Sequence, residues 1–108
     1  MDSIYELQAE LCKVFSNAKR IEILDTLNDS EMSSGELAQK TGLNNANLSQ
    51  HMAVLRARGV VISRRDGTNI YYRISDPRIT EARKLMRAVL LSQLQAKGKI
   101  ADNLEAVA

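Results

Sequence analysis

The chain of 108 residues contains one cysteine, one proline and no tryptophan. A single cysteine cannot form a disulfide within the chain, and this scarcity is typical of proteins from a reducing compartment. No apolar run approaches the roughly 18 residues that would predict a membrane-spanning helix. The opening stretch MDSIYELQAE has neither the basic start nor the continuous apolar centre of a secretion signal. We therefore expect a cytoplasmic protein that does not interact with membranes.

The sequence is also poor in the side chains that carry enzyme and metal chemistry. It has no Ser-His-acid arrangement, no glycine-rich phosphate loop and no cluster of metal ligands. Soft metals require several thiolates or imidazoles, and Cys12 and His51 cannot close such a site alone. Asp76 with Glu81 would make a poor transition-metal site. We expect a protein that is not an enzyme and that holds no metal and no cofactor.

Negatively charged residues are scarce in the middle of the chain. Residues 33–75 hold six Lys or Arg and two Asp or Glu, a balance of +4, whereas residues 1–32 hold three and seven, a balance of −4. The length allows one small domain, which we place at residues 1–108. Positive charge is thus concentrated in one segment of a single domain, as a surface that binds DNA phosphates requires.

The most informative stretch within this segment is LSQHMAVLRARG, residues 48–59. Helical spacing puts Leu48, Met52 and Leu55 on one apolar face. The opposite face carries small or uncharged side chains, with Gln50 among them. A helix that enters the major groove needs such a face, because small residues allow close approach and amides can meet base edges. The alternative is a solvated amphipathic helix, which would normally carry several Glu and Lys there.

A short helix with clear boundary signals precedes this stretch. The segment SSGE at residues 33–36 fits a capping box, and Gly42 suits the left-handed residue that ends a helix. Asn44 or Asn45 can then cap the next helix. Two helices joined by a short turn with a glycine have helix-turn-helix spacing, which puts the groove-binding helix at about residues 45–58.

Two runs rich in β-branched and aromatic residues follow, within about residues 60–75. Between them, Asp66-Gly67 is a strong turn signal and Thr68-Asn69 complete the loop. A two-stranded hairpin directly after a helix-turn-helix predicts the wing of a winged-helix fold. Arg64 and Arg65 would lie near its tip, where they can reach the DNA backbone or the minor groove. A plain structural hairpin is the alternative.

The remaining helices complete a mainly α fold with a small β-hairpin, in the order helix-helix-helix-helix-strand-strand-helix. Apolar residues recur at helical spacing over residues 3–15, 18–27 and 77–97, and Asp76-Pro77 opens the last of these helices. The helix at 3–15 has a second stripe of small residues, and the leucines of the last helix cannot all reach a small core. We expect a homodimer through the first and last helices. A first helix sunk more deeply into its own core is the alternative.

The residues that we predict to contact DNA come from the helix-turn-helix and the hairpin. Asn47 and Gln50 have amides that suit adenine edges, and Ser49 can serve a base or a phosphate. His51, at the edge of the apolar face, is either packed or in contact with phosphate. The complete set is Ser34, Asn45, Asn47, Ser49, Gln50, His51, Arg56, Arg64, Arg65, Thr68 and Asn69.

Three segments together resemble the ArsR/SmtB family of winged-helix repressors. They are FSNAKRIEILDTL (15–27), SSGELAQKTGLNNANLSQHMAVLRARGVV (33–61) and RRDGTNIYYRI (64–74). The resemblance covers most of the chain, from about Leu11 to Leu94. It implies a homodimer built from the first and last helices. It also implies that the dimer binds a double-stranded DNA operator and so blocks a promoter, and that an inducer releases the dimer from the operator.

The chain departs from the metal-sensing members of that family at their ligand positions. Where many carry cysteines it reads Glu31-Met32-Ser33-Ser34, and its last helix contains no histidine. We therefore expect a small organic inducer, oxidation at Cys12, or no inducer. Cys12 is otherwise a small packing residue in a helical interface.

A second class of function fits the same fold. A winged-helix domain can serve as a protein-interaction module that binds nucleic acid weakly or without specificity. The base-rich, acid-poor segment at residues 33–75 argues against this alternative.

Overall fold

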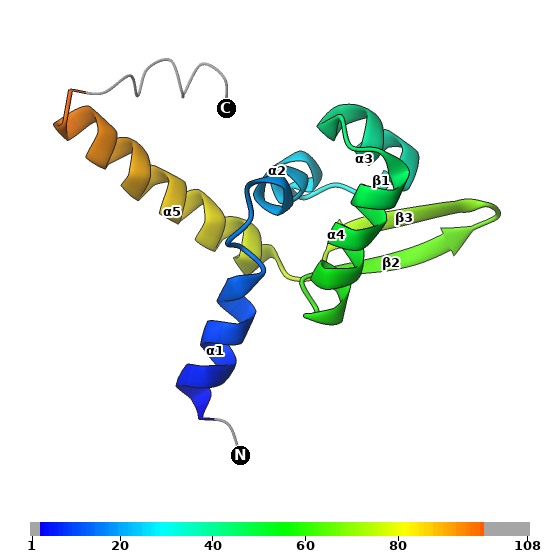
Figure 1. The fold of residues 1–108 in the computed structure, drawn as a ribbon, viewed down its shortest axis with the longest axis horizontal. Coiled ribbons are helices and arrows are strands. Elements are labelled where there is room, and N and C mark those ends of the chain that lie inside the picture. The colour runs from blue at the N-terminus through cyan, green and yellow to red at the C-terminus, as the bar shows by residue number, and fades with distance from the viewer. Residues whose placement is uncertain (1–2, 99–108) are drawn as a thin grey trace.

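The computed structural model describes residues 3–98, which form five helices and a small antiparallel sheet (Figure 1). In chain order the elements are α1 (Ile4–Lys13), α2 (Ala18–Leu27), β1 (Met32–Ser33), α3 (Ser34–Thr41), α4 (Asn45–Ala57), β2 (Val61–Asp66), β3 (Asn69–Ile74) and α5 (Pro77–Ala96). The predicted winged helix-turn-helix fold is confirmed. The first helix ends earlier than predicted, because Val14 and Phe15 turn toward the core. Within residues 3–98, no helix has the length and apolar character needed to span a membrane.

The boundaries of α3 and α4 depend on the side chains that the sequence indicates. Ser33 Oγ accepts from the Glu36 amide and the Glu36 carboxylate accepts from the Ser33 amide, each at 3.1 Å, so the predicted capping box is present. Gly42 ends α3 at φ 72°, a left-handed conformation that glycine adopts without steric cost. Asn44, and not Asn45, caps α4 by accepting from the Asn47 amide at 2.8 Å. Local capping therefore determines where α4 begins.

The sheet has three strands in the order β1-β3-β2, whereas the sequence predicts two. The added strand β1 pairs Met32 with Tyr72 and Ser33 with Tyr71 of β3. Two residues are too few to show the period-two alternation that indicates a strand. The strand exists because β3 offers it an unpaired edge.

The turn at the wing tip is tighter than predicted. Gly67 and Thr68 alone connect the strands, and Asn69 pairs with Asp66 instead of lying in the loop. Gly67 is at φ 63° and Thr68 is not at positive φ, which is the pattern of a type II′ turn. Such a turn matches the twist of the two strands, so the hairpin stays paired to its end.

The core lies where α2, α3 and α4 pack together and against the sheet. Its buried members are Val14, Ile23, Leu24, Leu27, Leu37, Leu48, Met52, Leu55, Val60, Val61, Tyr72 and Ile74. Leu48, Met52 and Leu55 are at most 2% exposed, which confirms the predicted apolar face of α4.

α1 and α5 project from this core in different directions (Figure 1). α1 contains no buried residue, and Tyr5 and Leu7 are 81% and 53% exposed. On α5, Leu85 and Met86 are 68% and 69% exposed. A first helix sunk deeply into its own core, the alternative drawn from sequence, is therefore wrong for this structure.

Charged side chains join α5 to the core. Arg83 and Arg87 both donate to the carboxylate of Asp25 on α2, and Arg83 Nη2 also donates to the Leu24 carbonyl at 3.3 Å. The Arg83 side chain is only 9% exposed. Ion pairs thus make part of the contact between α5 and its own domain. The exposed apolar side chains of α5 lie on the side of the helix that faces away from the domain.

Candidate nucleic-acid interface

The exposed side of α4 carries the polar residues that we predict to read DNA. Asn45, Asn47, Ser49 and Gln50 are all exposed in its first two turns. Residues 37–65 contain no Asp or Glu. Because this stretch itself carries no carboxylate, its amides can approach phosphates and base edges without charge repulsion from their own segment.

His51 lies at the edge of that side and is half-buried. Burial lowers the pKa of its imidazole, and the positive charges of Arg20 and Lys19 lower the pKa further. Both cations are anchored at the start of α2, since Arg20 Nε donates to the Val14 carbonyl at 2.7 Å and Lys19 Nζ to the Thr41 carbonyl at 3.0 Å. The lowered pKa favours the neutral imidazole, and with it the packed role over an ionic contact with phosphate.

Arg56, near the end of α4, reaches toward the wing. Its Nη1 donates to Ser63 Oγ on β2 at 3.3 Å. Ser63 is the cross-strand partner of the buried Tyr72, so it belongs to the inner face of the sheet, which α4 covers. The contact puts Arg56 between the end of α4 and the wing.

Arg64 and Arg65 project from opposite faces of the wing, because successive side chains of a strand alternate. Arg65 shares the inner face with Ser63, whereas Arg64 shares the outer face with its cross-strand partner Tyr71. The Arg64 guanidinium lies 4.5 Å from the centroid of the Tyr71 ring. Arg64 Nε and Nη2 donate to the two carboxylate oxygens of Glu31, at 2.9 and 2.7 Å. The sequence predicts the same role for both arginines, but in the structure they lie on opposite faces of the wing and Arg64 is paired with Glu31.

The other predicted residues lie at the start of α3 and at the wing tip. Ser34 is half-buried as the first residue of α3, and Thr68 and Asn69 are exposed at the wing tip. Sequence reasoning missed Glu31, which lies 33 positions from Arg64. No local pattern signals that contact, since it depends on the pairing of β1 with β3.

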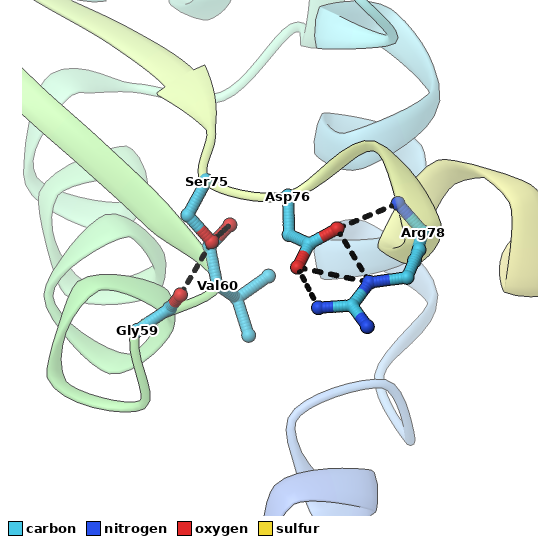
Figure 2. Close-up of polar contacts among 5 residues, drawn as sticks. All are labelled: Gly59, Val60, Ser75, Asp76 and Arg78. Carbon is cyan, nitrogen blue, oxygen red and sulfur yellow. Dashed lines mark hydrogen bonds and ion pairs between the residues drawn. The ribbon is translucent and has the colours of Figure 1, made fainter.

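The wing returns to α5 through a junction fixed by polar contacts (Figure 2). Ser75 Oγ lies 2.5 Å from the Gly59 carbonyl and 3.1 Å from the Val60 carbonyl, and it donates toward both. Asp76 caps α5 by accepting from the Arg78 amide at 2.9 Å. Hydrogen bonds from the Arg78 guanidinium and amide lower the pKa of the Asp76 carboxyl to about 2. The start of α5 is therefore held beside the end of α4.

A pocket of about 670 Å³ opens between this junction and α1. Its apolar lining includes Leu11, Phe15, Ile79 and Met86, and the exposed thiol of Cys12 also lines it. A volume of this size suits a small organic molecule. In the part of the chain that the structure describes, no three His, Cys, Asp or Glu side chains are grouped closely enough to hold a metal ion.

Sequence comparison relates the chain to known transcription regulators. Residues 17–63 match the family model described as bacterial regulatory protein, arsR family. The chain is 39% identical over 106 residues to the uncharacterized HTH-type transcriptional regulator Rv0081 of Mycobacterium tuberculosis. That alignment covers 97% of this chain and 93% of the relative. The chain is also 33% identical over 85 residues to the biofilm growth-associated repressor of Xylella fastidiosa. That alignment covers 79% of this chain and 75% of the repressor.

Solved structures show the same relationship. The crystal structure of Rv0081 matches with a TM-score of 0.81 at 40% identity, covering 90% of this chain and 98% of that chain. The solution structure of the homodimeric winged helix-turn-helix DNA-binding domain of Mb0332 from Mycobacterium bovis, described as a possible ArsR-family regulator, matches with a TM-score of 0.78 at 30% identity, covering 86% of each chain. With these relatives and this fold, the chain belongs to the ArsR family of winged helix-turn-helix transcriptional regulators, which are DNA-binding proteins and not enzymes.

Proposed function

We propose that this regulator is a homodimeric repressor that binds an inverted-repeat operator. The proposal rests on one observation: in the single chain, apolar side chains are exposed on both α1 and α5. On α5 the most exposed of them are Leu85 and Met86. Extended exposed apolar surfaces mark interaction sites. A second copy of the chain is the occupant we propose, and the homodimeric domain of Mb0332 supports it.

A two-fold dimer determines the form of the DNA site. It presents two copies of α4, which enter successive major grooves about one DNA turn, or a small multiple of it, apart. Because the two copies are related by symmetry, the operator is an imperfect inverted repeat. A dimer bound across a promoter blocks transcription, and the Xylella relative that is named a repressor supports this direction of control.

Within each half-site, we assign the residues of the protein to base contacts or to backbone contacts by the chemistry of their side chains. Asn47 and Gln50 contact base edges, and Ser49 serves a base or a phosphate. Arg64 stands apart from the other residues of the interface, because its guanidinium is already engaged by Glu31. The remaining residues contact or frame the backbone; they are Ser34, Asn45, His51, Arg56, Arg65, Thr68 and Asn69.

The dimer is tested by Leu90→Glu, since Leu90 is 51% exposed on α5 and belongs to the proposed apolar seam. We expect sedimentation to show a dimer for the parent and a monomer for the variant at micromolar concentration, because the seam would bury an unpaired charge. Gln95→Glu is the matched control, since Gln95 is exposed on another side of the same helix and should leave the dimer intact.

The operator is tested by selecting bound sequences from a random duplex pool. We expect a motif with dyad symmetry, and the Leu90→Glu variant should lose most of its affinity for it. A parent chain that sediments as a monomer, or a selected motif without symmetry, contradicts the proposal. A chain that binds no duplex would instead support a protein-interaction module.

For the inducer we propose a small organic molecule in the pocket between α1 and the start of α5. A ligand there contacts Leu11, Phe15 and Met86, and so touches both helices of the proposed dimer seam. It releases the operator only if it binds the free dimer better than the DNA-bound dimer. A screen for compounds that lower operator affinity tests this, with Ala82→Phe as the variant that should fill the pocket and abolish the response.

A further inference from the structure

We propose that Glu31 is a positioning residue of the wing, whose carboxylate holds Arg64 on the outer face of the sheet and leaves Arg65 as the phosphate contact of this strand. The inference rests on the proposed operator binding and specifies how the wing takes part in it. Two arginines that are adjacent in sequence thereby acquire different roles.

The Glu31–Arg64 pair has a specific geometry. Two hydrogen bonds of 2.9 and 2.7 Å join the guanidinium to both carboxylate oxygens, the bidentate arrangement that carboxylates and arginines form most strongly. The guanidinium also lies over the Tyr71 ring, 4.5 Å from its centroid. Asp66 Oδ2 also lies 3.9 Å from Arg64 Nη1, a longer approach than the two hydrogen bonds to Glu31. Arg64 is thus held mainly by Glu31 and Tyr71, although its side chain is 53% exposed.

The position of the pair in the sheet separates it from the surface of α4. Glu31 directly precedes β1, Tyr71 belongs to β3 and Arg64 belongs to β2, so the contact crosses all three strands. On the opposite face, Ser63 meets Arg56 of α4, and Arg65 is the next residue of β2 on that face. The inner face of the wing is therefore the face that meets α4. Arg65 lies on this face, one step closer to the wing tip than Ser63.

The outer face of the wing carries a compensated charge. Hydrogen bonds from Arg64 lower the pKa of Glu31, and the nearby charge of Arg73 contributes, so the carboxylate stays ionised at physiological pH. The Glu31 charge offsets that of Arg64, and the pair adds little net attraction for a polyanion. The affinity of the wing for DNA is therefore set lower than its number of arginines predicts.

The test measures the affinity of the full chain for a random-sequence duplex at several salt concentrations. Glu31→Gln removes the charge and keeps the size of the side chain, so Arg64 loses its bidentate partner and keeps only the longer approach to Asp66. We expect this variant to bind about threefold or more tightly at low salt, with a slope of log K against log salt steeper by about 0.9 for each additional phosphate that the protein neutralises. Arg65→Ala should weaken binding and flatten the slope. Arg64→Ala should leave the slope unchanged and weaken binding less than Arg65→Ala does, because it uncovers the Glu31 charge without removing a phosphate contact.

Two controls separate the inference from simpler effects. Glu81→Gln removes an exposed acid on α5 and should leave the slope unchanged, which rules out a general effect of net charge. Adding Arg64→Ala to Glu31→Gln should cancel the increase in affinity, because Arg64 is the cation released.

Several results would overturn the inference. They are a Glu31→Gln slope equal to that of the parent, a lower affinity for Glu31→Gln, or an Arg64→Ala loss as large as that of Arg65→Ala. A parent chain without affinity for duplex would overturn the proposed function itself. The parent measurement therefore distinguishes the two failures.

Discussion

At the scale of single residues, Gln50 is the most specific part of the proposed interface. It is exposed on α4, three positions after Asn47. We expect Gln50→Ala to cost about 1–3 kcal/mol on the best site and to relax preference at one or two base positions, because a bidentate pairing with a base edge is lost. Selection from a random duplex pool measures both effects. Gln39→Ala, an exposed glutamine of α3, is the control, and an unchanged motif for Gln50→Ala would contradict the assigned role.

His51 gives a prediction about pH. Its pKa in the folded chain lies below the ordinary 6.5, first because of burial and then because of Arg20 and Lys19. Between the lowered pKa and 6.5, the unfolded chain therefore binds more protons than the folded chain. By linkage, the free energy of unfolding should fall as the pH drops through that window.

Two measurements check this prediction. An NMR titration of the His51 ring protons should give a midpoint below 6.5. His51→Gln should unfold with a weaker pH dependence than the parent in the same window, since the titrating group is gone. A midpoint at or above 6.5 would show that the imidazole meets less burial and repulsion than the structure indicates.

At the scale of elements, the attachment of α5 to α2 depends on one carboxylate. Asp25 accepts from both Arg83 and Arg87, and the Arg83 side chain is 9% exposed. We expect Asp25→Asn to lower the free energy of unfolding by about 1–3 kcal/mol, because a buried guanidinium loses its ionised partner. Urea unfolding at one fixed protein concentration measures this, since a dimer couples stability to concentration. Asp29→Asn, at an exposed loop position, should change little.

The same variant tests how α5 is oriented. If Asp25 fixes the angle at which α5 leaves the core, Asp25→Asn should also weaken the proposed dimer. An unfolding curve and a dimer equilibrium that both match the parent would show that apolar contacts alone hold this helix.

At the scale of the whole molecule, the proposed dimer contains only two Cys12 thiols and two His51 imidazoles. Zinc, cadmium and arsenite bind tightly to clustered thiolates or imidazoles. We therefore expect operator affinity to survive stoichiometric amounts of each within a factor of about three, which is about 0.7 kcal/mol. A hundredfold loss with one metal per chain or per dimer, abolished by Cys12→Ser, would contradict this expectation.

Oxidation is a separate signal and needs its own comparison. Cys12 is exposed in the single chain and lines the pocket beside α1, and the comparison tests whether a peroxide reaches its thiol in the dimer. Cys12→Ser should retain operator binding in the absence of peroxide. If peroxide releases the parent but not the variant, Cys12 carries a redox signal; if both stay bound, an organic inducer or no inducer remains.

The local features of this protein were predictable because their causes lie within a few residues of each other. The Ser33–Glu36 capping box, the left-handed Gly42 and the buried face of α4 depend on contacts three or four positions apart. Their side chains meet as soon as the helix forms, so spacing alone indicates them. The order of helices and the wing followed from the same short-range patterns.

By itself, then, the sequence determined the winged helix-turn-helix and the polar outer side of α4. Only the tertiary structure decided which faces and charges meet. The Glu31–Arg64 contact spans 33 positions and the Arg83–Asp25 contact spans 58, and each exists because separate elements pack together. Strand alternation put Arg64 and Arg65 on opposite faces, but which face borders α4 depended on the packing of β2 against that helix. The different roles proposed for the two arginines are thus a consequence of packing, which no local pattern contains.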